Sequence, residues 1–300
     1  MRVVAAVILC LGLWGCKTQQ SKSLHVDASL ESLVPSDTVA IAGADLESIR
    51  GTLVYEKLLG RLPIPQLDEF TRQTGLDPRK DLSQLLFSTN GKHGLLMARG
   101  KFRRPDLERR LESNGASRFS HKNYRLFGSE ERAIFFLNDS IAVAGPAAEL
   151  RSMIDKQSPR GIPPALSAQI RTLPASDQIY AALIGGIEGM NFPVPAGSNA
   201  ANALQVLRSI DTGALGMDLS HGINLLLRVS SKSERDAKFV HDMVKGLVGL
   251  GRLNTPDNQP ELLKLYDAIQ VQQDQTMTTV MADIPQDLAE RFLDLWLKRQ

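Results

Sequence analysis

The sequence predicts an α+β protein made of two similar halves, each an antiparallel sheet with helices packed on one face. Pairs of apolar segments joined by short turns, as around Asn90-Gly91, are typical of β-hairpins. Segments with apolar residues at helical spacing follow these hairpins. The same order of segments recurs on either side of a group of breaking residues at 157–164, which indicates the boundary between the halves.

The first half is predicted over residues 25–157. It begins with a buried strand at 39–44 and a helix at 46–59, and Gly75 is expected to end the next helix. Pro105 suits the first turn of a later helix, since a helix does not need the missing amide there. The remaining elements are a helix at 64–74, a hairpin at 85–99, a helix at 104–113, strands at 124–127, 133–137 and 140–144, and a helix at 146–155.

The second half is predicted over residues 165–300. Its longest element is an amphipathic helix at 235–250, whose apolar residues repeat on one face. Pro285 is expected to precede the last helix, at 286–298. The other elements are a strand at 177–184 and hairpins at 213–230 and 269–282.

The amino terminus carries a targeting signal. Residues 3–13 form an apolar run that is shorter than the roughly 20 residues a membrane-spanning helix needs, but it suits a secretory signal. Leu13-Trp14-Gly15-Cys16 resembles the lipobox of bacterial lipoproteins, although Trp14 stands where a small residue is usual. The resemblance implies a signal peptide over 1–15, a lipid on Cys16 and a tether over 16–24. The alternatives are an ordinary cleaved signal with an incidental cysteine, or a short core segment.

The same resemblance implies a place in the cell envelope. Two acyl chains hold a protein stably at a bilayer, whereas one binds only marginally. Lys17 is not the aspartate that retains some lipoproteins at the inner membrane, so the outer membrane is favoured if the organism has one. Cys10 and Cys16 are the two cysteines, and we therefore expect no disulfide, thiolate metal site or cysteine nucleophile in the mature body.

One stretch is unusually basic. An anionic partner, either an envelope protein or an anionic envelope component, would gain about 1 kcal/mol per cation close to such a surface. The alternative is a solvated face neutralised by Asp106, Glu108 and Glu112. Nucleic acid is not expected, because aromatic residues are only 5% of the chain. The cations are Arg99, Lys101, Arg103, Arg104, Arg109, Arg110, Arg118, Lys122 and Arg125.

Patterns that carry chemistry are scarce. No two of the five histidines have metal-site spacing, and there is no Gly-x-Ser-x-Gly motif. His241 precedes Asp242 on a predicted helix, and neighbours at that spacing do not face each other, so we expect no dyad there. The sequence therefore predicts no catalytic residues, no metal, no cofactor and no enzyme activity.

The body of the chain resembles a group of uncharacterised exported bacterial proteins, a domain of unknown function. Residues 34–39, 74–82 and 100–102 carry the resemblance. It implies a similar fold and no reaction.

These observations predict a membrane-anchored envelope lipoprotein with a non-enzymatic binding or structural role. Two alternatives stay open. One is a carrier or sensor that holds an apolar ligand between the two halves, motivated by the long apolar helix face. The other is an unrecognised hydrolase.

Overall fold

The computed structural model describes residues 23–58, 65–157, 159–185, 208–256 and 259–297. Its strands are β1 (Ala40–Asp45), β2 (Leu82–Thr89), β3 (Gly94–Gly100), β4 (Arg118–His121), β5 (Tyr124–Gly128), β6 (Ala133–Asn138), β7 (Ile141–Gly145), β8 (Ile179–Ile184), β9 (Ile210–Asp218), β10 (Gly222–Ser231), β11 (Ile269–Asp274) and β12 (Met277–Pro285). Its helices are α1 (Ala28–Glu31), α2 (Leu46–Ile49), α3 (Leu53–Leu58), α4 (Pro65–Thr74), α5 (Pro78–Asp81), α6 (Arg104–Ser113), α7 (Ala147–Asp155), α8 (Pro164–Ile170), α10 (Glu234–Leu253), α11 (Pro260–Asp267) and α12 (Gln286–Leu297).

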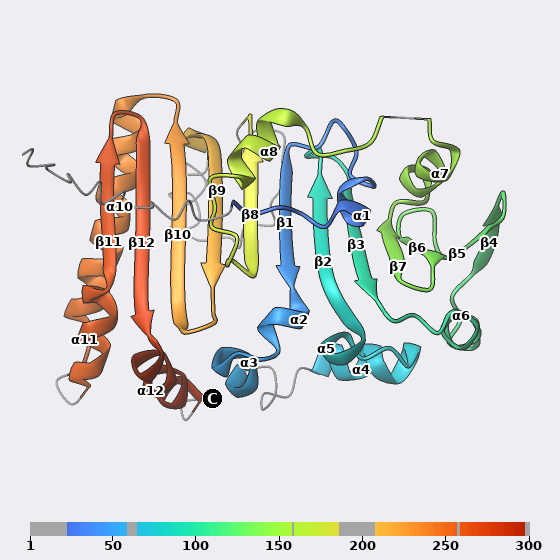
Figure 1. The fold of residues 1–300 in the computed structure, drawn as a ribbon, viewed down its shortest axis with the longest axis horizontal. Coiled ribbons are helices and arrows are strands. Elements are labelled where there is room, and N and C mark those ends of the chain that lie inside the picture. Colours follow the sequence, from blue (N-terminus) through green and yellow to red (C-terminus); the bar gives the residue numbers. More distant parts are fainter. Residues whose placement is uncertain (1–22, 59–64, 158, 186–207, 257–258, 298–300) are drawn as a thin grey trace, which may run out of the picture.

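The described strands all belong to one antiparallel sheet with the order β11-β12-β10-β9-β8-β1-β2-β3-β7-β6-β5-β4 (Figure 1). From the centre outward, β1-β2-β3-β7-β6 in one half matches β8-β9-β10-β12-β11 in the other. The prediction of an α+β fold with two similar halves is confirmed. The expectation of a separate sheet in each half needs correction, because β1 and β8 pair along their length. This pairing leaves neither strand as an open edge with unpaired backbone groups.

Helices lie on both faces of the sheet, not on one as the sequence predicted. Consecutive residues of a strand point to opposite faces. In β6, Phe135 belongs to the apolar cluster that contains Leu150 of α7, while Phe136 belongs to the cluster that contains Leu107 of α6. We call these two sides the α7 face and the α6 face. The α7 cluster also contains residues of α1 and α8.

One row of directly opposed residues shows how apolar the α6 face is. Residues directly opposite each other on antiparallel strands share a face. The row crosses the sheet at its middle and consists of Val280, Leu227, Leu215, Ala181, Ala42, Phe87, Leu96, Ala144, Ile134 and Phe127. Because Thr278 lies on the same face and donates to the Ala237 carbonyl of α10, this long helix also covers the α6 face.

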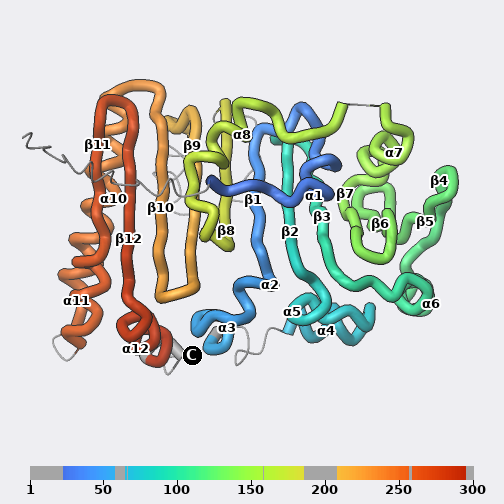
Figure 2. Tube along the Cα trace, viewed as in Figure 1, coloured from blue at the N-terminus to red at the C-terminus, as the bar shows by residue number. Residues whose placement is uncertain are grey.

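The two halves also exchange their leading segments. Ser23 bridges to Pro174 of the second half, and Arg160 bridges to Pro35 of the first. In Figure 2 the described chain enters across the central strands before it reaches α1. Leu24 is 5% exposed and its amide donates to the Leu173 carbonyl at 2.9 Å. The predicted tether over 16–24 therefore wrongly includes Leu24, because Leu24 is part of the core.

Local signals placed most other elements, but the helix predicted at 46–59 is wrong in one respect. The chain forms two short helices there, α2 and α3. Thr52 lies between them, and its hydroxyl donates to the Ile49 carbonyl and accepts from the Tyr55 amide. A threonine that bonds to nearby backbone in this way ends one helix and begins the next.

Candidate functional site

The most distinctive concavity is an apolar pocket of about 560 Å³ on the α6 face. The helices α4 and α6 form its roof, and strands β2, β3, β5, β6 and β7 contribute to its floor and walls. Its volume lies within the ~300–1,000 Å³ that small-molecule sites occupy. The pocket lies inside the first half, and not between the halves as the carrier or sensor alternative expected. The halves meet instead through the hydrogen bonds of β1 and β8.

Small side chains on the floor explain the space. Leu107 and Leu111 are four residues apart on α6, so both point from the helix toward the sheet. Beneath the roof lie Ala98, Ala142 and Ala144, which fill less volume than the leucines elsewhere in the sheet. The alanine side chains are too short to reach the leucines of α6, so a cavity remains between the helix and the sheet.

The rim of the pocket exposes apolar surface. Phe70 of α4 is 38% exposed and Leu96 of β3 is 43% exposed, and both line the pocket. Phe87 is directly opposite Leu96 and is 42% exposed. A contiguous exposed apolar area beside a cavity is typical of a binding surface.

A second concavity, of about 810 Å³, adjoins the first and has the opposite character. The two share Thr74, Leu76 and Leu107, so they meet where the end of α4 contacts α6. We call the second one the basic cleft. Its charged lining residues are Lys101, Arg103, Arg109, Arg110, Asp81 and Asp106.

The structure divides the basic stretch predicted from the sequence. Arg99 pairs with Asp27, and Lys122 lies 2.5 Å from Asp155 at the end of α7, so these two are on the α7 side of the sheet. The neutralisation that the sequence offered as an alternative applies to four more cations. Those pairs are Arg104 and Arg125 with Glu108, Arg109 with Asp106, and Arg118 with Glu112.

Three cations of the stretch behave differently. Within the part of the chain that the structure describes, Lys101, Arg103 and Arg110 have no ion pair. All three are exposed and all three line the basic cleft. The predicted patch therefore reduces to a smaller site, in which three unneutralised cations face one concavity.

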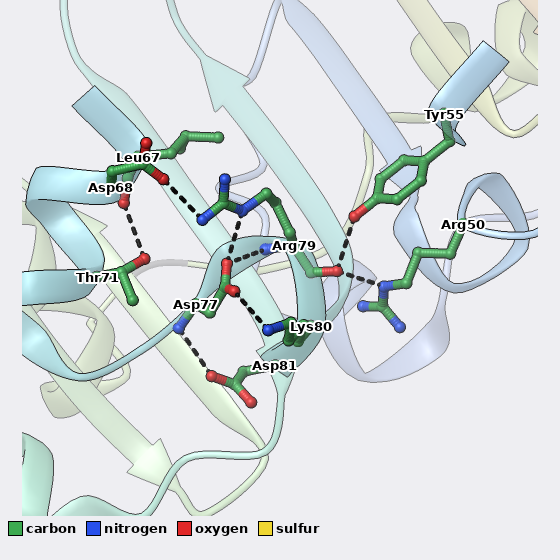
Figure 3. A network of polar contacts seen from close by, with 9 residues as sticks. All are labelled: Arg50, Tyr55, Leu67, Asp68, Thr71, Asp77, Arg79, Lys80 and Asp81. Carbon is green, nitrogen blue, oxygen red and sulfur yellow. Dashed lines mark hydrogen bonds and ion pairs between the residues drawn. The ribbon is translucent and has the colours of Figure 1, made fainter. Parts of the chain in front are cut away.

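A polar network fixes the segment between α4 and β2 (Figure 3). The Asp77 carboxylate accepts from the Arg79 amide at 3.1 Å, and an Asp81 oxygen accepts from the Asp77 amide at 2.8 Å. Arg79 also pairs with Asp68 of α4, and its carbonyl accepts from the Tyr55 hydroxyl at 2.9 Å. Partial burial acts to raise the pKa of Asp77, but hydrogen bonds from Arg79 lower it further, so it stays ionised.

Two of the histidines contact neighbouring carboxylates. His121 Nε2 lies 2.9 Å from an Asp155 oxygen, and Lys122 contacts the same carboxylate. His241 Nδ1 lies 2.9 Å from an Asp242 oxygen, so the expectation that these neighbours do not meet is wrong. The His241 and Asp242 side chains turn toward each other at the surface of α10. Among the described residues, no three His, Cys, Asp or Glu side chains are grouped as metal ligands.

The predicted signal peptide and lipid attachment site cannot be compared with the structure. Residues 1–15 and Cys16, which carry the lipobox resemblance, are not among the described residues. In the ranges that are described, no helix has the length and apolar character needed to cross a bilayer.

No protein family and no curated protein matches the chain. Crystal forms of TP0453 are among the solved structures to which this chain is similar. Form I is 10% identical, covers 90% of this chain and 96% of its own, and has a TM-score of 0.47. Form III is 10% identical, covers 90% and 97%, and has a TM-score of 0.49.

Proposed function

We propose that this chain is a lipid-anchored protein of the cell envelope that binds an apolar ligand without catalysing a reaction. The observation that carries the proposal is the pocket beneath α4 and α6. Burial of a ligand there removes apolar surface from water on both sides, at about 25 cal/mol per Å². The exposed Phe70 and Leu96 at the rim contribute surface that the folded chain alone leaves in contact with solvent.

The chemistry of the lining supports binding over catalysis. Among the described lining residues, only Thr74 and Arg132 are polar. The Thr74 hydroxyl already donates to the Phe70 carbonyl at 2.7 Å and accepts from the Leu76 amide at 3.1 Å. General acid–base catalysis usually uses His, Asp, Glu, Lys, Tyr or Cys, and none of these is among the described lining residues.

A charge in the pocket wall tests the binding role. We expect Leu96→Asp to weaken binding of the neutral dye N-phenyl-1-naphthylamine by at least about tenfold, because the ligand would have to desolvate a carboxylate. Fluorescence titration measures the dissociation constant. Leu247→Asp is the matched control, since Leu247 is 60% exposed on α10 and does not line the pocket. Equal binding by both variants, or no binding by the unmodified protein, would contradict the proposal.

The anchor is tested separately on the two cysteines. In a lipoprotein-processing bacterium, the protein is expected to incorporate a radioactive fatty acid and to sediment with membranes. Cys16→Ala should abolish the label, because the sulfur that accepts the lipid is missing, whereas Cys10→Ala should keep it. Label that survives in Cys16→Ala would show that the lipid is carried elsewhere and would overturn the anchor.

A further inference from the structure

We infer that the pocket takes an anionic amphiphile, whose charged head lies on Lys101, Arg103 and Arg110 and whose alkyl chain lies beneath α4 and α6. This inference rests on the proposed function and names the class of ligand for the same site. It combines the two adjoining concavities, one apolar and one basic, into a single site with two chemically different ends.

The chain itself alternates between the two concavities. Phe102 is 4% exposed and lines the apolar pocket, while its neighbours Lys101 and Arg103 are exposed and line the basic cleft. The backbone holds this arrangement in place, because the Lys101 amide donates to the Asp81 carbonyl at 2.8 Å and the Phe102 amide to the Asp139 carbonyl at 2.9 Å. Two cations therefore flank the aromatic ring at the boundary of the pocket.

Arg110 reaches the same boundary from α6. Gly75 has φ +76°, and a Cβ atom placed on it would lie 2.9 Å from Arg110 Nε. The guanidinium of Arg110 thus occupies space that any other residue at position 75 would obstruct. Gly75 lies between Thr74 and Leu76, which line both concavities, so this guanidinium sits where the apolar pocket opens into the cleft.

The charge of the basic cleft favours an anionic head group on the ligand. The cleft presents four cationic side chains against Asp81 and Asp106, and Asp106 is already paired with Arg109. One carboxylate oxygen of Asp81 accepts a hydrogen bond from the Asp77 amide. The three cations without an ion pair are available to a carboxylate or phosphate oxygen, to which arginine can donate two parallel hydrogen bonds. A neutral head would leave them with water alone.

The inference is tested with three ligands that have the same alkyl chain length but different head groups. Decanoate, decyl phosphate and decan-1-ol would each compete with N-phenyl-1-naphthylamine on the full-length protein at low ionic strength. We expect at least one anion to bind about tenfold more tightly than the alcohol, as charge-assisted hydrogen bonds imply. The comparison of carboxylate with phosphate distinguishes a fatty-acid head from a phospholipid-like one. The preference should decrease as salt screens the exposed cations.

The decisive variant replaces all three cations with glutamine: Lys101→Gln, Arg103→Gln and Arg110→Gln. It should bind the anions and the alcohol about equally, with affinity for the alcohol unchanged. The control variant Lys92→Gln, Arg171→Gln and Arg235→Gln removes the same charge from exposed positions outside both concavities and should keep the preference. Equal binding of anion and alcohol by the unmodified protein, or a preference that survives the first variant, would overturn the inference and leave the proposed function standing. Failure of every ligand to displace a bound dye would also overturn the inference, whereas failure of the dye itself to bind would overturn both.

Discussion

Gly43→Ala is expected to destabilise the protein by about 3 kcal/mol, although it adds only one methyl group. Gly43 of β1 is directly opposite Tyr180 of β8, at the pairing that joins the two halves. A Cβ atom on Gly43 would lie 2.2 Å from Tyr180 Cζ, and Tyr180 is only 8% exposed, so its ring cannot move aside without disturbing the core. Overpacking of this kind typically costs ~1–3 kcal/mol. Urea unfolding measures the change in the free energy of unfolding.

Two further variants isolate the cause. Gly213→Ala, on β9, should cost far less, because the nearest heavy atom to its Cβ would be 3.5 Å away. In a Tyr180→Ala background, Gly43→Ala should no longer destabilise, since the ring that obstructs the methyl group is absent. A cost that persists in that background would show that the ring is not responsible.

The contribution of Asp177 to stability is expected to fall as pH rises from about 4 to about 6. Burial, and the nearby charge of Asp218, raise the pKa of Asp177 from 3.8 to about 6. Its Oδ2 atom has no hydrogen-bond partner among the residues that the structure describes. The folded state therefore holds this proton more tightly than the unfolded state. The stabilisation from protonated Asp177 is complete below about pH 4 and is lost as pH rises through 6. A shift of about two pKa units corresponds to about 2–3 kcal/mol.

Asp177→Asn should remove this dependence and make the protein about 2 kcal/mol more stable than the unmodified chain at pH 7. Denaturant unfolding at pH 4, 5, 6 and 7 would show it as a difference between the two proteins that grows with pH. Asp218→Asn is the control and should act in the opposite direction. Burial acts to raise the pKa of Asp218, but hydrogen bonds from the Ser220 amide and from side chains lower it further, so its charged form is stabilised. A constant difference between Asp177→Asn and the unmodified protein would contradict this account.

Local sequence signals predicted elements whose ends are set by neighbouring residues. The helix at 104–113 has the predicted bounds, because Pro105 and Gly115 mark its two ends. The strand β4 (Arg118–His121) was not predicted. It is a short edge strand in which exposed residues alternate with residues that are only partly buried. Such a strand is specified by its partner β5 more than by its own composition.

The candidate site was predicted only in part. The nine cations were visible in the sequence, but Asp27 and Asp155, which neutralise two of them, come from distant segments. The apolar pocket was not predicted. Ala98, Ala142 and Ala144 signalled small side chains on neighbouring strands, yet nothing local shows that α4 and α6 stand above that face.

The sequence by itself determined the order and type of most elements, the similarity of the halves, and the charge that any site could use. Those properties depend on residue spacing over one or two turns of chain. Only the tertiary structure decided that both halves share one sheet and that helices cover both faces. It also decided that three cations beside an apolar pocket have no ion pair with any described residue. Strand pairing and ion pairing join residues far apart in the chain, so the residues near each partner do not specify them.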